Sequence, residues 1–411
     1  MNNKEKIVKI LPMMQKEPMT LLVKPDKLSP ISNQLNFALV LEKGWEEKNN
    51  VNKYNDFEWV FSYEHLLKSA DLCKRNVYWK ASVQNFMYEK DFNVSVIHNE
   101  LMSNRFKVKH KHKFVIYERG KKRTIQSVHI RERVVQRCLC DYCLTPLLEP
   151  TFCYDNCASQ KNKGISFAID RVKRHLQKYY REYGNNDGYI LLFDYSNYFG
   201  SINHEMIMGK LKKYVTDQRI LDIVQIFINE FDEGLGLGSQ VSQVLSLFAA
   251  SPIDHMIKDQ MRFKYFIRYM DDGLIIHNDK KELENLLKKI IVMSDELGFT
   301  INKKKTHIAT IKHFRFLKKR FSLLDNGKII VKLSADSITR MRRKLIKFEK
   351  LYDEGRMSFE NIKTSYQSWR GFALQYDSYN SVQRLDKYYE NLISKIIKKE
   401  LERKKVKTKS I

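Results

Sequence analysis

The sequence predicts an α+β fold with a helical C-terminal part. Short apolar runs typical of strands, at 188–194 and 265–270, are interspersed with helical patterns through the middle of the chain, and helical spacing continues to the C-terminus. Mixed elements followed by helices alone are typical of an α+β body with an added helical subdomain. We therefore expect an N-terminal extension over 1–75, a mixed body over 76–325 and a basic helical part with a tail over 326–411.

Before the first of these runs, the sequence predicts basic strands over 105–117 and a helix over 131–148. Residues 188–194 are apolar up to their last residue, Asp194, which predicts a buried strand that ends in a carboxylate. Residues 265–277 predict a strand, a tight turn and a second strand, with Asp271 and Asp272 at the tip.

Helical signals follow the hairpin. Asp279 is a candidate N-cap, and Gly298 closes the helix that follows it. Farther on, one apolar stripe at helical spacing contains Ile338, Met341, Leu345, Phe348 and Tyr352, and basic residues occupy the remaining surface. The tail over 403–409 is rich in lysine, and we expect it to be frayed and solvated.

The charge of the chain indicates the type of partner. There are 74 Lys and Arg against 48 Asp and Glu, a formal net charge of +26. Nucleic acid is the usual partner of such a surface, because phosphate binding releases counterions; the alternative is a protein that is merely basic. No apolar run approaches the roughly 20 residues of a membrane span, and the N-terminus is too mixed for a secretory signal. We therefore expect a cytoplasmic protein without a membrane partner.

Five of the six cysteines fall within 138–157. Zinc sites usually contain paired Cys-x-x-Cys units, and here only Cys140 and Cys143 have that spacing. Their apolar surroundings favour buried small residues on a helix, with a zinc site as the less favoured alternative.

The acids at the strand end and the hairpin tip suit nucleotidyl transfer. Joining nucleotides requires a 3′-hydroxyl to lose its proton and a pyrophosphate to be neutralised, and two Mg²⁺ about 4 Å apart do both. Mg²⁺ prefers carboxylate oxygens, so two or three acids on rigid elements are sufficient. Taken singly, Asp194 and the Asp271-Asp272 pair also fit an ordinary helix cap and an ordinary turn.

An ordered set of motifs resembles the reverse transcriptase family over roughly residues 90–325. Arg268-Tyr-Met-Asp-Asp-Gly273 resembles the family's Tyr-x-Asp-Asp box. The other motifs occur in the family's order and lie at 121–125, 130–136, 156–164, 193–202, 238–243, 297–306 and 313–321, with a weaker echo at 365–371. The resemblance implies a right-hand polymerase with fingers, a palm of antiparallel sheet plus helices, and a helical thumb.

The resemblance implies an RNA-directed DNA polymerase that copies an RNA template into cDNA from a DNA or RNA primer with dNTPs. Asp194 and Asp271 would bind two Mg²⁺, for which Mn²⁺ could substitute. Asp272 would support the site, and the carbonyl of Tyr195 would complete one metal shell. Phe199 would be a steric gate against the ribose 2′-hydroxyl; its alternative role is a core aromatic residue.

Further roles are implied for residues that contact nucleotide or nucleic acid. The expected nucleotide-binding residues are Lys121, Arg123, Phe199, Leu237, Gly238, Gln243 and Lys305. The expected nucleic-acid-binding residues are Gln160, Lys163, Phe316, Leu317, Arg343 and Lys347. For the basic residues among them, the alternative is a solvated surface charge.

Three positions depart from the common family pattern. Leu237 stands where many relatives have Gln, Lys318 where Gly is usual and Gln160 where Arg is usual. The Leu-Gly-x-x-x-Ser-Gln form resembles reverse transcriptases of diversity-generating retroelements, and defence-associated reverse transcriptases that copy a non-coding RNA are similar in outline. A leucine cannot donate the amide hydrogen bond to a nucleotide, so we expect low fidelity.

Other functions and partners stay open at this point. A catalytically inactive nucleic-acid-binding fold is the alternative class, against which the intact acids argue. An RNA-templated RNA polymerase usually has Gly-Asp-Asp at the hairpin, so Tyr269-Met-Asp-Asp and Phe199 argue against it. No RNase H, HNH or integrase signature follows the thumb, so we expect dependence on an accessory protein or a non-coding RNA. The oligomeric state is not predicted.

Overall fold

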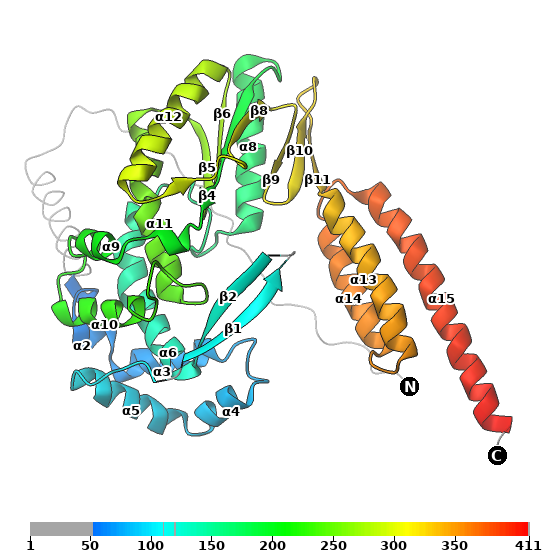
Figure 1. Ribbon diagram of the computed structural model, residues 1–411, viewed down its shortest axis with the longest axis horizontal. Coiled ribbons are helices and arrows are strands. Elements are labelled where there is room, and N and C mark those ends of the chain that lie inside the picture. Colours follow the sequence, from blue (N-terminus) through cyan, green and yellow to red (C-terminus); the bar gives the residue numbers. More distant parts are fainter. Residues whose placement is uncertain (1–51, 110, 119–120, 410–411) are drawn as a thin grey trace, which may run out of the picture. The chain divides into compact units, whose positions relative to one another are not determined.

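The structure is a computed structural model that describes residues 52–109, 111–118 and 121–409 (Figure 1). Side chains in parts of the 111–128 hairpin and beyond residue 399, apart from Leu401, lie outside the description. All elements named below belong to one compact unit, Lys53–Ile411. Most of the predicted extension over 1–75 lies outside the described residues, so its boundary stays a prediction.

The first described part is mainly helical, with one two-stranded ribbon. Its elements are α2 (Phe57–Val60), α3 (Tyr63–Cys73), α4 (Ala81–Tyr88), α5 (Lys90–Met102), β1 (Lys111–Glu118), β2 (Lys121–Val128), α6 (Ile130–Leu139), the π-helix η1 (Cys140–Leu144), α7 (Thr145–Leu148) and η2 (Glu149–Thr151). Helix α3 begins after Ser62, whose hydroxyl accepts from the His65 amide, as expected of an N-cap. It packs against α5 and α6, so residues before 76 share a core with the body of the protein.

A four-stranded antiparallel sheet forms the centre, in the order β5-β6-β3-β8. Its strands are β3 (Tyr189–Phe193), β5 (Tyr265–Tyr269), β6 (Asp272–His277) and β8 (His307–Thr310). Strand β3 is buried on both faces, which explains its continuous apolar sequence. The predicted strand before Asp194 and the predicted hairpin are both confirmed.

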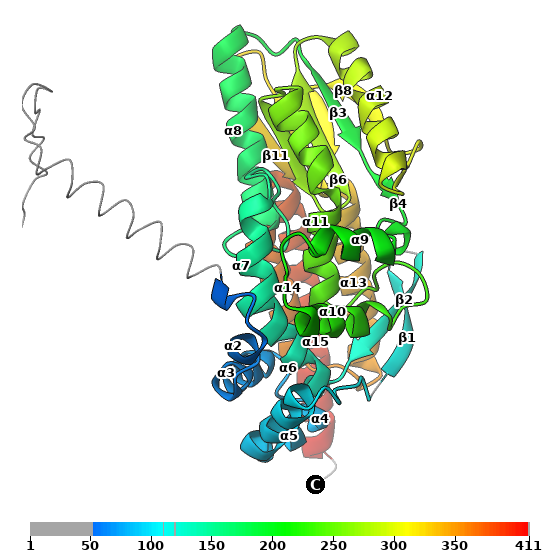
Figure 2. The ribbon, with the colours of Figure 1, turned by 90° about the vertical axis from the view of Figure 1, so that its left-hand side faces the viewer.

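Helices cover both faces of this sheet. Leu191 and Phe193 pack with α11 (Gln240–His255) and α12 (Lys280–Glu296), whereas Ile190 and Leu192 pack with α8 (Ile165–Tyr183). Figures 1 and 2 show α12 and α8 on opposite sides of the strands. Asp279 caps α12 as predicted, accepting from the Lys281 amide.

Smaller elements surround the sheet. These are β4 (Tyr195–Ser196), η3 (Phe199–Ser201), α9 (His204–Leu211), α10 (Gln218–Ile228), η4 (Met256–Gln260) and β7 (Thr300–Ile301). A second, three-stranded sheet has the order β11-β10-β9, with β9 (His313–Phe316), β10 (Lys319–Leu323) and β11 (Ile329–Leu333). Its apolar face joins the α8 side of the core.

Three helices complete the chain: α13 (Ala335–Asp353), α14 (Phe359–Ala373) and α15 (Tyr379–Lys409). Of the predicted stripe, Met341, Leu345, Phe348 and Tyr352 are buried, and they pack against α14 and α15. The loop before α15 is fixed to β11, because the Val331 amide donates to the Asp377 carboxylate (2.8 Å) and the Leu333 amide to the Ser378 hydroxyl (2.9 Å).

The prediction that residues 403–409 fray is wrong, since α15 continues to Lys409. The segment contains neither Gly nor Pro, and five of its seven residues are Lys or Arg, which are strong helix formers. The α+β fold class with a helical C-terminal part is confirmed. None of the helices in the described ranges is long and apolar enough to cross a membrane.

Candidate active site

The register of the central sheet brings the predicted acids to the same end of neighbouring strands. Phe193 pairs with Gly273, and Tyr269 pairs with Asp272, so Asp194 follows a strand whose neighbour begins at Asp272. Met270 and Asp271 form the two-residue turn between β5 and β6. Met270 has φ +53°, a left-handed conformation that is uncommon for a residue with a Cβ.

The segment 302–306 encloses Asp194, which is 3% exposed. Its carboxylate accepts from Lys305 Nζ at 2.5 Å and from Asn302 Nδ2 at 3.0 Å. Its amide donates to the Thr306 hydroxyl (3.3 Å), and its carbonyl accepts from the Asn302 amide (2.8 Å). Asp194 is therefore held by both its backbone and its side chain before any ligand arrives.

The three carboxyl groups line the same cavity and affect one another's ionisation. Burial, with the nearby charges of Asp271 and Asp194, raises the pKa of Asp272 to about 7, and Asp194 also shares a hydrogen bond with it. Like charges gathered in a half-buried site disfavour simultaneous ionisation. A divalent cation would relieve this repulsion, and carboxylate oxygens are the ligands that Mg²⁺ prefers.

In this structure, the cation that contacts Asp194 is the Lys305 ammonium. Within the described ranges, no three His, Cys, Asp or Glu side chains already form a metal site. The donor set fits a divalent ion, but ion binding requires Lys305 to release Asp194 and the three carboxylates to adjust.

A buried arginine supports the turn that carries Asp271. Arg268 and Asp254 are both fully buried, and they form a bidentate pair at 2.6 and 2.8 Å between β5 and α11. The same guanidinium donates to the Met270 carbonyl at 2.9 Å. Arg268 lies within one of the sequence motifs, but no role was predicted for it; a single charged residue inside the apolar run 265–269 is a signal that could have indicated one.

The outer edge of β5 is also fixed. The Arg268 amide donates to the Asp155 carbonyl at 3.0 Å, and the Cys157 amide donates to the Arg268 carbonyl at 2.8 Å. The carboxylate of Asp155 accepts from Arg171 Nε on α8 (2.8 Å) and from Lys258 on η4 (2.9 Å). The hairpin is thus held from both sides of its first strand.

A cavity of about 560 Å³ lies against the acids. It is within the range typical of sites for small organic ligands. Nine of the predicted site residues line it: Asp194, Phe199, Leu237, Gln243, Asp271, Asp272, Lys305, Phe316 and Leu317. Residues far apart in the sequence therefore meet around one space.

Phe199 stands on a tightly packed support. Its carbonyl accepts from the Leu235 amide at 2.7 Å, and Gly234, at φ +64°, lies so close that a Cβ there would be 2.4 Å from the Gly200 Cα. Only glycine fits this approach. The loop that brings Leu237 to the cavity is therefore fixed to the backbone beside Phe199.

The β9–β10 turn forms another part of the cavity wall. Phe316 pairs with Lys319, which leaves Leu317 and Lys318 as a two-residue turn with φ +45° and +62°. Such a turn requires left-handed residues at both central positions and normally uses Asn or Gly. The wall therefore carries backbone strain.

Gln160, Lys163 and Gly238 do not line this cavity. Gln160 and Gly238 line a separate groove of about 820 Å³, which Gln243 also borders. The Lys163 ammonium donates to the carbonyls of Tyr154 (3.0 Å) and Asn156 (3.1 Å) and to the Gln160 side chain (2.9 Å). Burial lowers its pKa. In this structure Lys163 stabilises its own loop, and its contact with template stays a prediction.

Gly238 has φ +108°, where a side chain would be strained. Tyr195 is buried against Tyr198 and Phe299, and on β4 it pairs with Ile301.

Arg343 and Lys347 are exposed on α13. Lys121 and Arg123 belong to β2, but their side chains lie outside the described residues.

The clustered cysteines are packing residues. Cys138, Cys140 and Cys143 are fully buried along α6 and η1, and burial raises the pKa of each thiol well above its usual range. The Cys138 thiol donates to the Val60 carbonyl at 3.1 Å. The interpretation of these three as buried small residues on a helix is confirmed.

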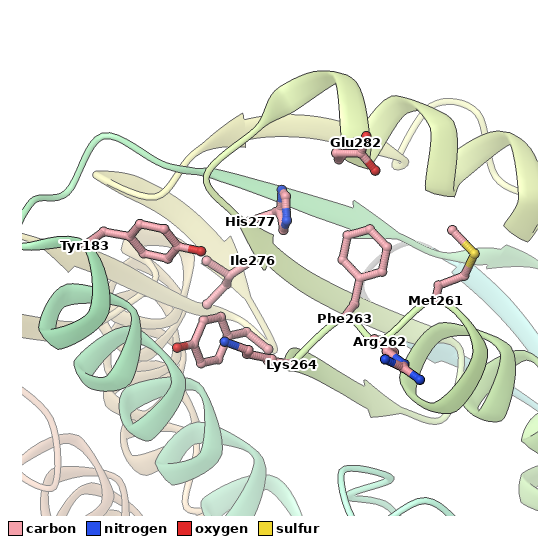
Figure 3. Close-up of a pocket in the computed structure, with 9 residues that line it drawn as sticks. Tyr183, Met261, Arg262, Phe263, Lys264, Ile276, His277 and Glu282 are labelled. Atoms are coloured by element: carbon pink, nitrogen blue, oxygen red, sulfur yellow. The ribbon is translucent and has the colours of Figure 1, made fainter.

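A second pocket lies at the other end of the β5–β6 hairpin (Figure 3). Its lining includes Tyr183 of α8, Phe263, Lys264 and His277. At about 160 Å³ it is below the usual size of a nucleotide-sized site, and no predicted site residue lines it.

Comparison with known proteins identifies a family. The sequence model described as reverse transcriptase (RNA-dependent DNA polymerase) matches residues 109–324, more than half of the chain. No curated protein matches the sequence. Two similar solved structures are telomerase from Candida albicans in complex with a fragment of telomeric RNA, and apo telomerase from Candida tropicalis truncated from its C-terminal domain.

Both solved chains are 14% identical to this one. The TM-scores are 0.44 and 0.39, with 74% and 57% of this chain covered, respectively. This chain spans 60% of each of them.

Proposed function

Because the chain belongs to the reverse transcriptase (RNA-dependent DNA polymerase) family, we propose that it copies an RNA template into DNA by two-metal nucleotidyl transfer at Asp194, Asp271 and Asp272. The observation that supports this most is the convergence of these acids on one cavity, where burial and the two neighbouring acids raise the pKa of Asp272. The proposed substrates are an RNA template, a DNA or RNA primer and deoxynucleoside triphosphates.

Divalent ions, when bound, would supply the Lewis acidity that assists loss of the 3′-hydroxyl proton and neutralises pyrophosphate. Asp194 and Asp271 would hold the ions, aided by the carbonyl of Tyr195. Asp272 would support the site with its nearby carboxylate. Arg268 keeps the turn in place through the Met270 carbonyl. Lys305, after it releases Asp194, would move its charge and a proton toward the leaving pyrophosphate.

Other cavity residues would select the nucleotide. The Phe199 ring would exclude a ribose 2′-hydroxyl. The contact of its backbone with residues 234–235 would prevent Phe199 from moving away from the nucleotide. Leu237 has no hydrogen-bonding group in its side chain, so base selection would depend on steric complementarity rather than on an amide hydrogen bond. Arg123 and Lys121 on β2 would reach the triphosphate, and Gln243 would lie beneath the template base.

We further propose that this chain serves a diversity-generating retroelement, where mutagenic copying suits an active site with Leu237 in its wall. The alternative is a defence-associated enzyme that copies a non-coding RNA. Sequencing the RNA and cDNA that copurify with the protein separates the two. A repeat transcript together with cDNA that differs from it at many positions supports the retroelement role. A structured non-coding RNA together with a faithful cDNA copy supports the defence role.

Primer extension on an RNA template with Mg²⁺ tests the chemistry. We expect the wild type to incorporate deoxynucleotides, and Asp271→Asn with Asp272→Asn to lose roughly a hundredfold or more in rate. A matched control is Asp295→Asn with Glu296→Gln, which removes two adjacent exposed acids from the end of α12. Equal rates for the wild type and the Asp271/Asp272 variant would refute the metal assignment, and a wild type that binds primer–template without extending it would indicate an inactive polymerase fold.

A further inference from the structure

Lys319 breaks the apolar pattern on the core-facing side of β10. Burial alternates along this strand, so Lys319, Phe321 and Leu323 point to the same side and are all buried. Phe321 and Leu323 belong to the apolar core, whereas Lys319 is a cation that is only 5% exposed. Lysine is almost never fully buried unless a partner compensates for the lost water. A buried lysine at a position that suits an apolar residue therefore indicates a role beyond packing.

Two aromatic rings, rather than an acid, contact the buried ammonium. Lys319 Nζ lies 4.5 Å from the centre of the Phe372 ring and 4.4 Å from the centre of the Tyr376 ring. Phe372 ends α14 with Ala373, Tyr376 lies in the loop that follows, and the two rings pack edge to face with centres 5.5 Å apart. In the part of the chain that the structure describes, Lys319 has no ion pair, and burial lowers its pKa. Cation–π contacts are strongest where water is excluded. We name Lys319 and these two rings the lysine clamp.

The lysine clamp lies directly behind the strained turn of the cavity wall. Leu317 and Lys318 have φ +45° and +62°, and both line the cavity that contains the acids. Lys319 follows them and pairs with Phe316 across the turn, but it does not itself line the cavity. Strained backbone persists only where the surrounding structure holds it. Here the lysine clamp and the Ser334 amide, which donates to the Lys318 carbonyl at 3.3 Å, hold the turn from behind.

We propose that Lys319 is a positioning residue that holds the strained turn, and with it the Leu317 side chain, in place at the cavity. The Phe372 and Tyr376 rings fix the ammonium, and the pairing of Lys319 with Phe316 carries this restraint to the turn. The role rests on the proposed function, because a polymerase is what gives the cavity a nucleotide to bind. Loss of the restraint should weaken nucleotide binding and leave the chemistry at the acids unchanged.

The variant Lys319→Met of the full-length protein tests this role, because methionine keeps the length of the side chain and removes its charge. Single-nucleotide extension on an RNA template annealed to a DNA primer gives kcat and KM for the incoming deoxynucleotide. We expect KM to rise about threefold or more with little change in kcat. Lys319→Arg should restore KM, because a guanidinium also binds aromatic faces. The matched control is Lys80→Met, which removes a lysine 5.5 Å from the centre of the Trp79 ring, away from the cavity lining. A KM equal to that of the control overturns the proposal.

Hydrogen exchange gives a readout that does not need catalysis. The amides of residues 316–319 should exchange at least about threefold faster in Lys319→Met, because the turn then opens more often. Lys318→Gly removes the left-handed strain at one of the two turn positions, so Lys319→Met should have a clearly smaller effect in that background. Equal effects in both backgrounds would show that Lys319 does not act through the turn.

Stability and salt dependence separate this role from two others. An apolar residue can replace a buried charge with little loss of stability, so Lys319→Met should melt close to the wild type. A lower melting temperature with unchanged KM would indicate packing alone, and a log–log salt slope of primer–template binding that falls by about one would indicate a direct phosphate contact. Either result refutes the positioning role. If Lys319→Met does not fold, Phe372→Leu, at a position that is 41% exposed, should raise KM in the same way.

Failure of the proposed function is a separate outcome. It would appear as a wild-type protein that binds primer–template but adds no nucleotide. Faster exchange of residues 316–319 in Lys319→Met would still show that the lysine holds the turn.

Discussion

Replacing Arg268 with methionine is expected to destabilise the protein strongly. The substitution removes a fully buried guanidinium and leaves the fully buried carboxylate of Asp254 without its two hydrogen bonds of 2.6 and 2.8 Å. Removing one partner of a buried pair costs about 3–5 kcal/mol, because the remaining charge stays desolvated. Burial already raises the pKa of Asp254 while Arg268 opposes the shift, so the carboxyl should take up a proton once Arg268 is gone.

The measurement is the free energy of unfolding from urea titration of the wild type, Arg268→Met, Asp254→Leu and the double variant. Replacing both members by apolar residues removes the desolvated charges, so the double variant should recover most of the loss, and the cycle should give a coupling energy of at least about 2 kcal/mol. A loss below about 1 kcal/mol for Arg268→Met, or additive effects of the two substitutions, would refute this reasoning.

The same series separates stability from positioning. In the double variant the Met270 carbonyl still lacks its 2.9 Å donor. We therefore expect the double variant to unfold near the wild-type urea concentration but to extend primers at least about tenfold more slowly. Wild-type extension by a stable double variant would show that the turn does not need Arg268.

Three further predictions concern separate side chains. Phe199→Val should raise the ratio of ribonucleotide to deoxynucleotide incorporation about tenfold or more in single-nucleotide assays, because the ring no longer blocks the 2′-hydroxyl; an unchanged ratio would place the gate elsewhere. Leu237→Gln should lower the misincorporation frequency roughly tenfold, because the amide can form about one additional hydrogen bond to the correct nucleotide. Sequencing the products made from a defined template measures this frequency. Burial lowers the pKa of Lys210 to about 8, from 10.5 when unfolded, so the unfolded state binds more protons between these values. The free energy of unfolding of the wild type relative to Lys210→Met should thus rise by about 3 kcal/mol from pH 8 to pH 10.5, and a flat difference would contradict the shift.

Local patterns in the sequence predicted the scaffold of the site well. The apolar run before Asp194, the hairpin around Asp271 and the capped helix after Asp279 each depend on neighbours a few residues away, and all are present. Such signals are readable because strand and helix periods are local properties.

The partners that hold the site were not predictable in the same way. Asn302 reaches Asp194 across 108 positions of sequence, and Arg268 pairs with Asp254 across a strand and a helix. Nothing in either neighbourhood specifies which distant polar group a buried side chain will meet. Lys163 illustrates the opposite case, because its nearest acceptors belong to its own loop.

The strained turn at Leu317 and Lys318 is a position in the cavity wall where substitution could increase stability. Each left-handed residue with a side chain costs of order 1 kcal/mol, so Asn-Gly at these two positions should yield a more heat-resistant protein. That gain would remove the Leu317 side chain from the space beside the acids. In this hairpin, greater thermal stability and a Leu317 side chain that lines the cavity therefore exclude each other. The Leu-Lys sequence of the turn retains the cavity side chain at a cost in stability.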